Sequence, residues 1–272
     1  MKIAQIQAHV YDDKMKNLEE FRKKMEGLRD EKIDMVTLGE MFNCPYQTQC
    51  FPEYAEEEGG ETWKALSDMA KEYGVYLSAG SVPEKDEQGH VYNTAYVFDR
   101  SGNQIAKHRK VHLFDINVQG GQAYKESETL TAGDGHTVFD TEFGKMGICI
   151  CFDFRFPEIA RLMVQDGAKV IFVPAAFNMT TGPAHWEIML RGRAVDNQCF
   201  VIATSDARDE NSGYISWGHS MIVSPWGDIV QEMDEKEGIM ITEIDLEYVE
   251  EIRQQLPLLS ARRTDLYELR AL

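Results

Sequence analysis

The chain has 272 residues, with 28 Lys and Arg against 46 Asp and Glu, so its formal net charge at pH 7 is −18. Nucleic acids and anionic membrane surfaces are bound through clustered basic residues, and this charge balance argues against both as partners. Hydrophobic residues make up 43% and charged residues 27% of the chain, which is the composition of a folded domain rather than of a disordered segment.

Short apolar or alternating runs recur along the chain and are separated by segments with helical periodicity. The runs predict strands at residues 3–10, 35–38, 75–81, 92–98, 146–152, 170–173, 200–204, 221–223 and 239–244. Helices are predicted at residues 16–29, 62–73, 157–165 and 186–197, and Gly74 and Gly167 are typical of helix stops. The pattern indicates an α/β protein, but it leaves open whether the strands form one sheet or two.

Two turn signals set the direction of some strands. Asp99–Gly102 and Ser224–Gly227 join neighbouring runs too closely for a crossover helix, so these pairs are expected to be antiparallel hairpins. Since other strands are separated by helices, mixed sheets are predicted. No repeat, low-complexity segment or linker divides the chain, so we expect a single domain over residues 1–272.

The cellular setting is inferred from three negative signals. No run approaches the roughly 18 apolar residues of a membrane span, and the N-terminal residues carry charge where a signal peptide has its apolar run. Five cysteines, an odd number in a long chain, argue against a secreted disulfide framework. We therefore expect a cytoplasmic protein. Residues 251–272 alternate charge with Leu, and they are a candidate for packing on a partner subunit rather than on their own core.

The segment Gly147–Glu158 has the strongest chemical signal. An apolar strand leads into Cys151, and Asp153 and Pro157 are typical of a turn and the first residues of a helix. Free backbone N–H groups at such an elbow lower a thiol's pKa from about 8.5 and can stabilise an oxyanion. Cys149 has the same strand parity, and either cysteine could be a buried core residue. The elbow favours Cys151 as a nucleophile.

A thiol nucleophile needs a base and a positive group near the developing oxyanion. Glu40 follows the apolar run 35–39, so it is a carboxylate at the C-terminal end of a strand, where α/β proteins assemble active sites. Lys110 lies within residues 106–115, between polar and apolar neighbours. Taken singly, either charge could be solvated on the surface, and seven histidines leave a Cys-His pair open.

Three alternative hypotheses assign the chain to other functional classes. His108 and His112 have the i, i+4 spacing of a metal-dependent hydrolase, but Arg109 stands where the zinc pattern needs Glu. A dithiol of Cys149 and Cys151 lacks the Cys-x-x-Cys spacing of redox motifs. The third reading is a catalytically inactive binding protein.

Taken together, Glu40, Lys110 and Cys151 resemble the Glu-Lys-Cys triad of the nitrilase superfamily of carbon–nitrogen hydrolases. The matching motifs stand in the family's order as LGEMFN at 38–43, RKVHLFD at 109–115 and CFDFRFPE at 151–158, and the resemblance extends from residue 2 to about residue 269. The family's fourth functional carboxylate falls on Glu126. The resemblance implies a four-layer α-β-β-α sandwich of two mixed sheets with helices outside. It also implies a homodimer or higher homo-oligomer formed by helices beside Cys151.

The ω-amidase branch, whose members hydrolyse the side amide of 2-oxoglutaramate and 2-oxosuccinamate, is the most similar. The segments that resemble it are 45–46, 51–55, 177–187, 193–198, 217–220 and 251–257. The chain departs from the pattern at Gly39, where many members have Pro, at Phe152, where they often have Tyr, and at residues 121–124, beside the expected pocket. An N-carbamoyl amino-acid hydrolase, an aliphatic amidase and an amidase for deaminated glutathione therefore remain alternatives.

The resemblance also implies a mechanism without metal or cofactor. Glu40 takes the proton of Cys151, and the thiolate attacks the amide carbon of a small-molecule amide. Lys110 and the backbone N–H of Phe152 hold the oxyanion, ammonia leaves, and water hydrolyses the thioester. Glu126 orients Lys110 or the substrate amide.

A 2-oxo acid substrate has a carboxylate, which an acidic protein must bind with a local cation. Arg155 is the leading candidate because a guanidinium offers two parallel donors, and the alternative is an ion pair with Asp153 or Glu158. The branch implies three further pocket positions, each of which could equally serve packing: Tyr46, Phe177 and Thr181. A threonine at 180 or 181 could instead cap the helix expected to begin near Ala184.

Overall fold

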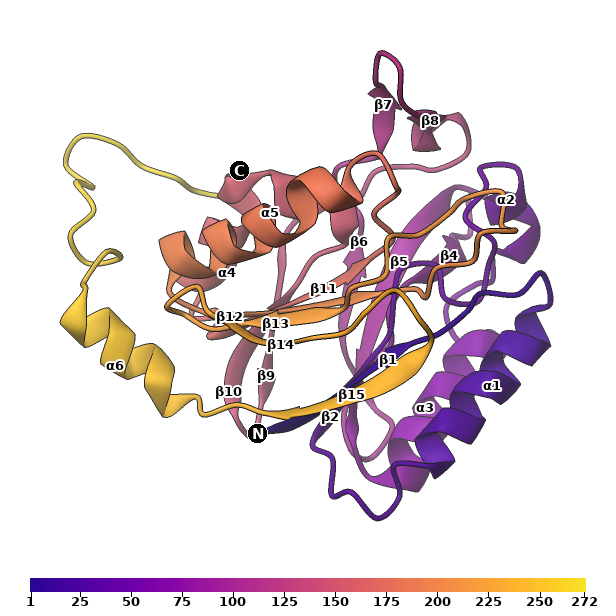
Figure 1. Ribbon diagram of the computed structural model, residues 1–272, viewed down its shortest axis with the longest axis horizontal. Coiled ribbons are helices and arrows are strands. Elements are labelled where there is room, and N and C mark those ends of the chain that lie inside the picture. The colour runs from indigo at the N-terminus through magenta and orange to yellow at the C-terminus, as the bar shows by residue number, and fades with distance from the viewer.

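The computed structural model describes all 272 residues and contains two mixed β-sheets packed face to face, with helices on their outer faces (Figure 1). The first sheet has the order β15-β1-β2-β3-β5-β4, with β6 beside β5. Its strands are β1 (Lys2–Gln7), β2 (Met35–Thr37), β3 (Tyr76–Ser78), β4 (Val82–Lys85), β5 (Val91–Phe98), β6 (Gln104–Arg109) and β15 (Gly238–Glu243). Strands β1, β2 and β3 run parallel, and the other pairs are antiparallel.

The second sheet has the order β14-β13-β12-β11-β10-β9. Its strands are β9 (Thr137–Thr141), β10 (Gly144–Ile148), β11 (Val170–Ala175), β12 (Phe200–Ser205), β13 (Met221–Val223) and β14 (Ile229–Glu232). Strands β10, β11 and β12 are parallel neighbours. A separate two-stranded ribbon of β7 (Asp115–Asn117) and β8 (Ala123–Lys125) projects from the sandwich (Figure 1).

Helices complete the outer layers. The first sheet is covered by α1 (Lys14–Glu26) and α3 (Glu61–Tyr73), and the second by α4 (Pro157–Gln165) and α5 (Gly182–Asn197) (Figure 1). The remaining helices are α2 (Cys50–Tyr54), α6 (Glu247–Gln255) and the 3₁₀ turns Glu126–Glu128 and Cys151–Arg155. No helix is long and apolar enough to cross a membrane.

The largest core lies between the two sheets. Ile3 and Met35 of the first sheet are buried with Phe172 and Ile202 of the second in one cluster of 36 residues. Polar residues cross the same interface: Gln5 donates to the hydroxyl of Thr204 at 2.9 Å. Because buried polar groups need such partners, this bond links β1 of the first sheet to β12 of the second. The predicted four-layer α-β-β-α sandwich is confirmed.

The helices and strands predicted from the sequence are present in this fold with the predicted type. The fold has more strands than were predicted, and several elements begin or end at other residues. All four predicted helices and both hairpins are present, whereas β4, β6, β7, β8, β9 and β14 were not predicted. The missed strand β6 reads QIAKHR, and a polar strand at the margin of a sheet shows little of the apolar alternation that marks a strand. The strand expected at 146–152 ends at Ile148, because the chain turns before Cys151.

One expectation about a helix end was wrong. The helix expected near Ala184 begins at Gly182, and the hydroxyl of Thr181 donates to Asn178 at 3.1 Å rather than capping it. Residues 251–255 end α6, in which Val249 and Ile252 are buried. The packing of residues 251–272 on a partner stays a prediction.

Candidate active site

The carboxyl ends of parallel strands meet at one end of the sandwich and bring the candidate residues together. Glu40 follows β2, Cys151 follows β10 and Ala176 follows β11. Such ends are where α/β sheets place functional side chains, because the loops that follow the strands converge there. Glu40 and Lys110 have no exposed surface, and Cys151 is 5% exposed, so the site is closed in this conformation.

Cys151 lies on a sharp elbow between β10 and the 3₁₀ turn. Its φ is 44°, a left-handed conformation that costs a non-glycine residue roughly 1–3 kcal/mol. Asp153 stabilises the elbow by accepting a hydrogen bond from the backbone N–H of Ile150 at 3.1 Å. The N–H of Phe152, at the second position of the turn, has no protein acceptor within hydrogen-bond distance. It is therefore free to donate to an oxyanion.

The expectation that the elbow lowers the pKa of the Cys151 thiol is wrong. Burial raises this pKa well above its ordinary value, and the nearby charge of Glu40 raises it further. The charge of Lys110 and the backbone N–H of Ala176 act in the opposite direction, but they do not outweigh burial. The resting cysteine is therefore a thiol, and it needs a base to become a nucleophile.

Four donor groups surround Glu40, and one of them, the hydroxyl of Tyr46, shares its single proton between Glu40 and Glu126. Its Oε1 accepts hydrogen bonds from Lys110 Nζ at 2.7 Å, from Asn93 Nδ2 at 2.8 Å and from the hydroxyl of Tyr46 at 3.0 Å. Its Oε2 accepts the backbone N–H of Ala176 at 3.0 Å. A carboxylate held in this way beside a protonated thiol has the position of a general base.

Lys110 bridges two carboxylates. Its Nζ donates to Glu126 Oε1 at 2.9 Å as well as to Glu40. Burial lowers the pKa of Lys110, but the charges of Glu126 and Glu40 outweigh burial and leave this pKa above its ordinary value. Lys110 is therefore a permanent ammonium at neutral pH, and it can stabilise negative charge that develops nearby.

Glu126 is held by hydrogen bonds from Phe114, in the loop after β6, and from Tyr46. Its Oε2 accepts the backbone N–H of Phe114 at 2.6 Å, and its Oε1 accepts the hydroxyl of Tyr46 at 2.6 Å. Burial raises the pKa of Glu126, although the charge of Lys110 opposes this rise. Glu126 and Glu40 thus hold the Lys110 ammonium together.

Tyr46 is a full member of this network rather than a packing residue. Besides its two carboxylate bonds, its ring lies 4.5 Å from that of Tyr214 and 5.6 Å from that of Tyr124. Tyr214 in turn donates to the carbonyl of Ala176 at 2.6 Å. Sequence reasoning missed Asn93, Tyr124 and Tyr214. The one available signal was Asn93, an amide inside the apolar strand β5.

Arg155 lies beside the nucleophile without an acidic partner. Its Nη1 is 3.1 Å from Nδ1 of His185, and its guanidinium lies 4.7 Å from the ring centre of Phe177. Burial lowers the pKa of Arg155. Its guanidinium also lies 5.7 Å from the ring centre of Phe152, the residue after Cys151. The alternative ion pairs with Asp153 or Glu158 do not form.

The two other expected pocket residues differ in their placement. Phe177 packs edge-on against Trp186 at 4.9 Å and faces Arg155, so it borders the site. Thr181 is bound within the Asn178 turn by its backbone N–H and its hydroxyl, and no contact joins it to the triad.

The departure at Gly39 has a steric reason. A Cβ at this position would lie 2.2 Å from Asp206 Oδ1, so only glycine fits before Glu40. Burial raises the pKa of Asp206 well above its ordinary value, and the charge of Glu40 adds to the rise. Both effects favour the neutral form of Asp206 over a second negative charge beside Glu40.

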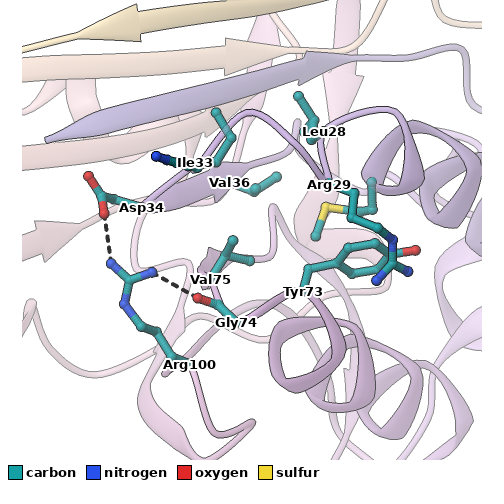
Figure 2. Close-up of a pocket in the computed structure, with 11 residues that line it drawn as sticks. Leu28, Arg29, Ile33, Asp34, Val36, Tyr73, Gly74, Val75 and Arg100 are labelled. Carbon is teal, nitrogen blue, oxygen red and sulfur yellow. Dashed lines mark hydrogen bonds and ion pairs between the residues drawn. The ribbon is translucent and has the colours of Figure 1, made fainter.

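A groove elsewhere on the surface has no part in this site. It has a volume of about 240 Å³ and lies between the ends of α1 and α3. Figure 2 shows that Arg100 there donates to Asp34 and to the carbonyl of Gly74, at 2.7 and 2.8 Å. Its lining includes none of the candidate catalytic residues.

Comparison with known proteins agrees with this geometry. Residues 2–254 match the family model described as carbon-nitrogen hydrolase. Omega-amidase NIT2-A of Xenopus laevis is 48% identical over 98% of this chain and 97% of its own length, and omega-amidase NIT2 of Bos taurus is 46% identical over 99% and 98%. The crystal structure of Saccharomyces cerevisiae Nit3, a member of branch 10 of the nitrilase superfamily, has a TM-score of 0.89 and 40% identity, over 97% of this chain and 96% of its own.

Proposed function

The chain belongs to the carbon–nitrogen hydrolase family, and from this membership we propose that it is an ω-amidase that hydrolyses 2-oxo dicarboxylic acid monoamides such as 2-oxoglutaramate and 2-oxosuccinamate. As a family member it is a hydrolase of non-peptide C–N bonds in linear amides. The observation that carries the proposal is the buried assembly of Glu40, Lys110 and Cys151 with an unpaired Arg155 beside it.

Glu40 begins the proposed reaction by taking the proton of the Cys151 thiol. The sulfur then forms a bond to the amide carbon, and the carbonyl oxygen becomes an oxyanion between Lys110 Nζ and the Phe152 N–H. When the oxyanion collapses, the C–N bond breaks and Glu40 returns the proton to the leaving nitrogen, which departs as ammonia.

Water completes the cycle on the same residues. Glu40 takes a proton from water, and the hydroxide attacks the thioester carbon to form a second oxyanion. Its collapse breaks the C–S bond, and Glu40 returns the proton to the sulfur of Cys151. The acid product leaves and the enzyme is restored. Glu126 and Tyr46 keep Lys110 and Glu40 in place through both halves.

The free carboxylate of the substrate is proposed to bind Arg155. Its guanidinium lies over Phe177 and contacts His185 but no acid, so an incoming carboxylate would not have to displace an acidic partner. This cation would select a monoamide with a carboxylate at the far end over a neutral amide.

The test is an ammonia-release panel of 2-oxoglutaramate, 2-oxosuccinamate, N-carbamoyl amino acids, an aliphatic amide and deaminated glutathione. The proposal predicts the highest kcat/KM for the two 2-oxo acid monoamides. A preference for a carbamoyl substrate or for deaminated glutathione would contradict the proposed substrate class, but not the proposed roles of Glu40, Lys110 and Cys151. Loss of activity to a chelator would instead contradict the whole mechanism.

We further propose a homodimer formed through α5. Ile188 is 69% exposed, and Val195 and Trp226 are exposed beside it along a shallow hollow. Exposed apolar side chains grouped in this way are typical of an interface. Light scattering should give a dimer for the wild type at micromolar concentration and a monomer for Ile188→Asp, and a monomeric wild type would contradict the proposal.

All five cysteines are free thiols. Reduced thiols suit a reducing compartment, and on this ground we propose that the enzyme works in the cytoplasm. Fractionation of cells that express the tagged chain would test it, and recovery from a secreted fraction would contradict it.

A further inference from the structure

The two groups that are proposed to hold the oxyanion come from different segments of the chain. Lys110 follows the last residue of β6, and Phe152 lies on the elbow after β10. These strands belong to different sheets. Something must therefore fix the separation of the two groups, and one side chain, Asp153, contacts both segments.

Asp153 accepts five hydrogen bonds and has no exposed surface. Its Oδ1 accepts the backbone N–H groups of Val111 and His112, at 3.1 and 2.8 Å, so it grips the residues directly after Lys110. Its Oδ2 accepts the N–H of Ile150, at the start of the elbow. A single carboxylate thus ties the lysine segment to the nucleophile segment.

Two histidines complete the coordination of this carboxylate. His112 Nδ1 lies 2.9 Å from Oδ1, and His108 Nε2 lies 3.0 Å from Oδ2. A carboxylate only accepts, so the proton in each contact belongs to the ring nitrogen. His112 also stacks on Phe156 with ring centres 3.8 Å apart. The pair that has the spacing of metal ligands therefore flanks Lys110 and binds an acid instead.

Asp153 is charged under any assay condition. Burial raises its pKa, but the hydrogen bonds from His108 and His112 outweigh burial and bring the pKa below its ordinary value. An ionised acceptor makes each of the five bonds stronger than a bond between neutral groups. The link that Asp153 makes between the lysine segment and the nucleophile segment is therefore rigid.

We propose that Asp153, His108 and His112 are positioning residues that hold the Lys110 ammonium and the Phe152 N–H at the spacing an oxyanion requires. The proposal rests on the amidase function proposed above. A shift of about 1 Å in such a site can lower the rate by 10²-fold. The three residues touch no reacting atom, so they act through Lys110 and Phe152.

A pair of substitutions at His112 separates its hydrogen bond from its ring stacking. His112→Asn places an amide donor near the position of Nδ1 and removes the stack on Phe156. His112→Phe keeps the stack and removes the donor. The control is His90→Phe. It removes an exposed contact between a histidine and an aspartate away from the site, in which His90 Nδ1 lies 3.1 Å from Asp86 Oδ2.

Three quantities are measured for each variant: kcat and KM for 2-oxoglutaramate, the thermal midpoint, and the rate of Cys151 alkylation by iodoacetamide. Alkylation needs the thiol but no oxyanion, so it reports the nucleophile alone. We expect His112→Phe to lower kcat about 10- to 100-fold with KM within about twofold. We expect His112→Asn and His90→Phe to stay within about threefold of the wild type, and alkylation to be unchanged in all.

The opposite order, with His112→Asn impaired and His112→Phe active, would show that stacking and not the bond matters, and would overturn the proposal. An equal fall in alkylation and kcat would overturn it too, because the nucleophile itself would then be displaced. If His112→Phe does not fold, Asp153→Asn takes its place in the comparison. The NH₂ group of the side-chain amide would then face N–H donors where the carboxylate of Asp153 has an acceptor oxygen, so the link between the two segments would be broken on one side. A wild type that releases ammonia from no amide overturns the proposed function instead.

Discussion

Replacing Arg155 by Met removes the guanidinium but keeps a long apolar chain over Phe177. The guanidinium has no acidic partner to leave behind, so the loss is confined to what it binds. A hydrogen bond to a charged group is worth about 1.5–3 kcal/mol, which is roughly 10- to 150-fold in affinity. We expect kcat/KM for 2-oxoglutaramate to fall by about this factor.

The assay compares 2-oxoglutaramate with a neutral primary amide of similar length, which has no carboxylate to lose. For the neutral amide we expect Arg155→Met to change kcat/KM by less than about threefold. The matched control is Arg29→Met, whose guanidinium lies 4.8 Å from the ring centre of Tyr73, outside the site. An equal fall for both substrates would refute the reasoning, because it would make Arg155 a structural residue.

Two further predictions concern the base and the nucleophile. Tyr46→Phe removes hydrogen bonds to Glu40 and Glu126, so kcat should fall about tenfold, whereas Tyr124→Phe, which loses a bond to the Tyr46 carbonyl, should change it less. An unchanged kcat in Tyr46→Phe would count against the network. Because burial raises the pKa of Cys151, the rate of alkylation by iodoacetamide should keep rising above pH 9, and a plateau near pH 8.5 would contradict the buried thiol.

Local motifs made part of the site predictable. Glu40, Lys110 and Cys151 each stand at the end of an apolar run or within a recognisable motif, so the sequence singled out the three residues that the structure brings together. Asn93 offered only the weak signal of an amide inside an apolar strand, and Tyr214, in the loop between β12 and β13, offered none, because their partners Glu40 and Ala176 are distant in sequence. Side-chain partners of this kind follow from packing rather than from the segment that contains them.

The failed expectations share the same physical origin. The elbow at Cys151 was predicted correctly as a turn, but its effect on the thiol depends on burial, which local sequence does not report. Thr181 precedes a helix, yet Asn178 takes its hydroxyl. The strand β6 was missed because its side chains are charged or half-buried, and hydrophobic periodicity cannot reveal such a strand.

The most direct test of the account is the mass of the protein quenched with acid during turnover of 2-oxoglutaramate. The account predicts an acyl adduct on Cys151, which disappears together with ammonia release in Cys151→Ala. Cys149→Ala should retain both, because Cys149 lies in the core beneath the elbow. An adduct on another residue, or ammonia release by Cys151→Ala, would contradict the assignment of the nucleophile.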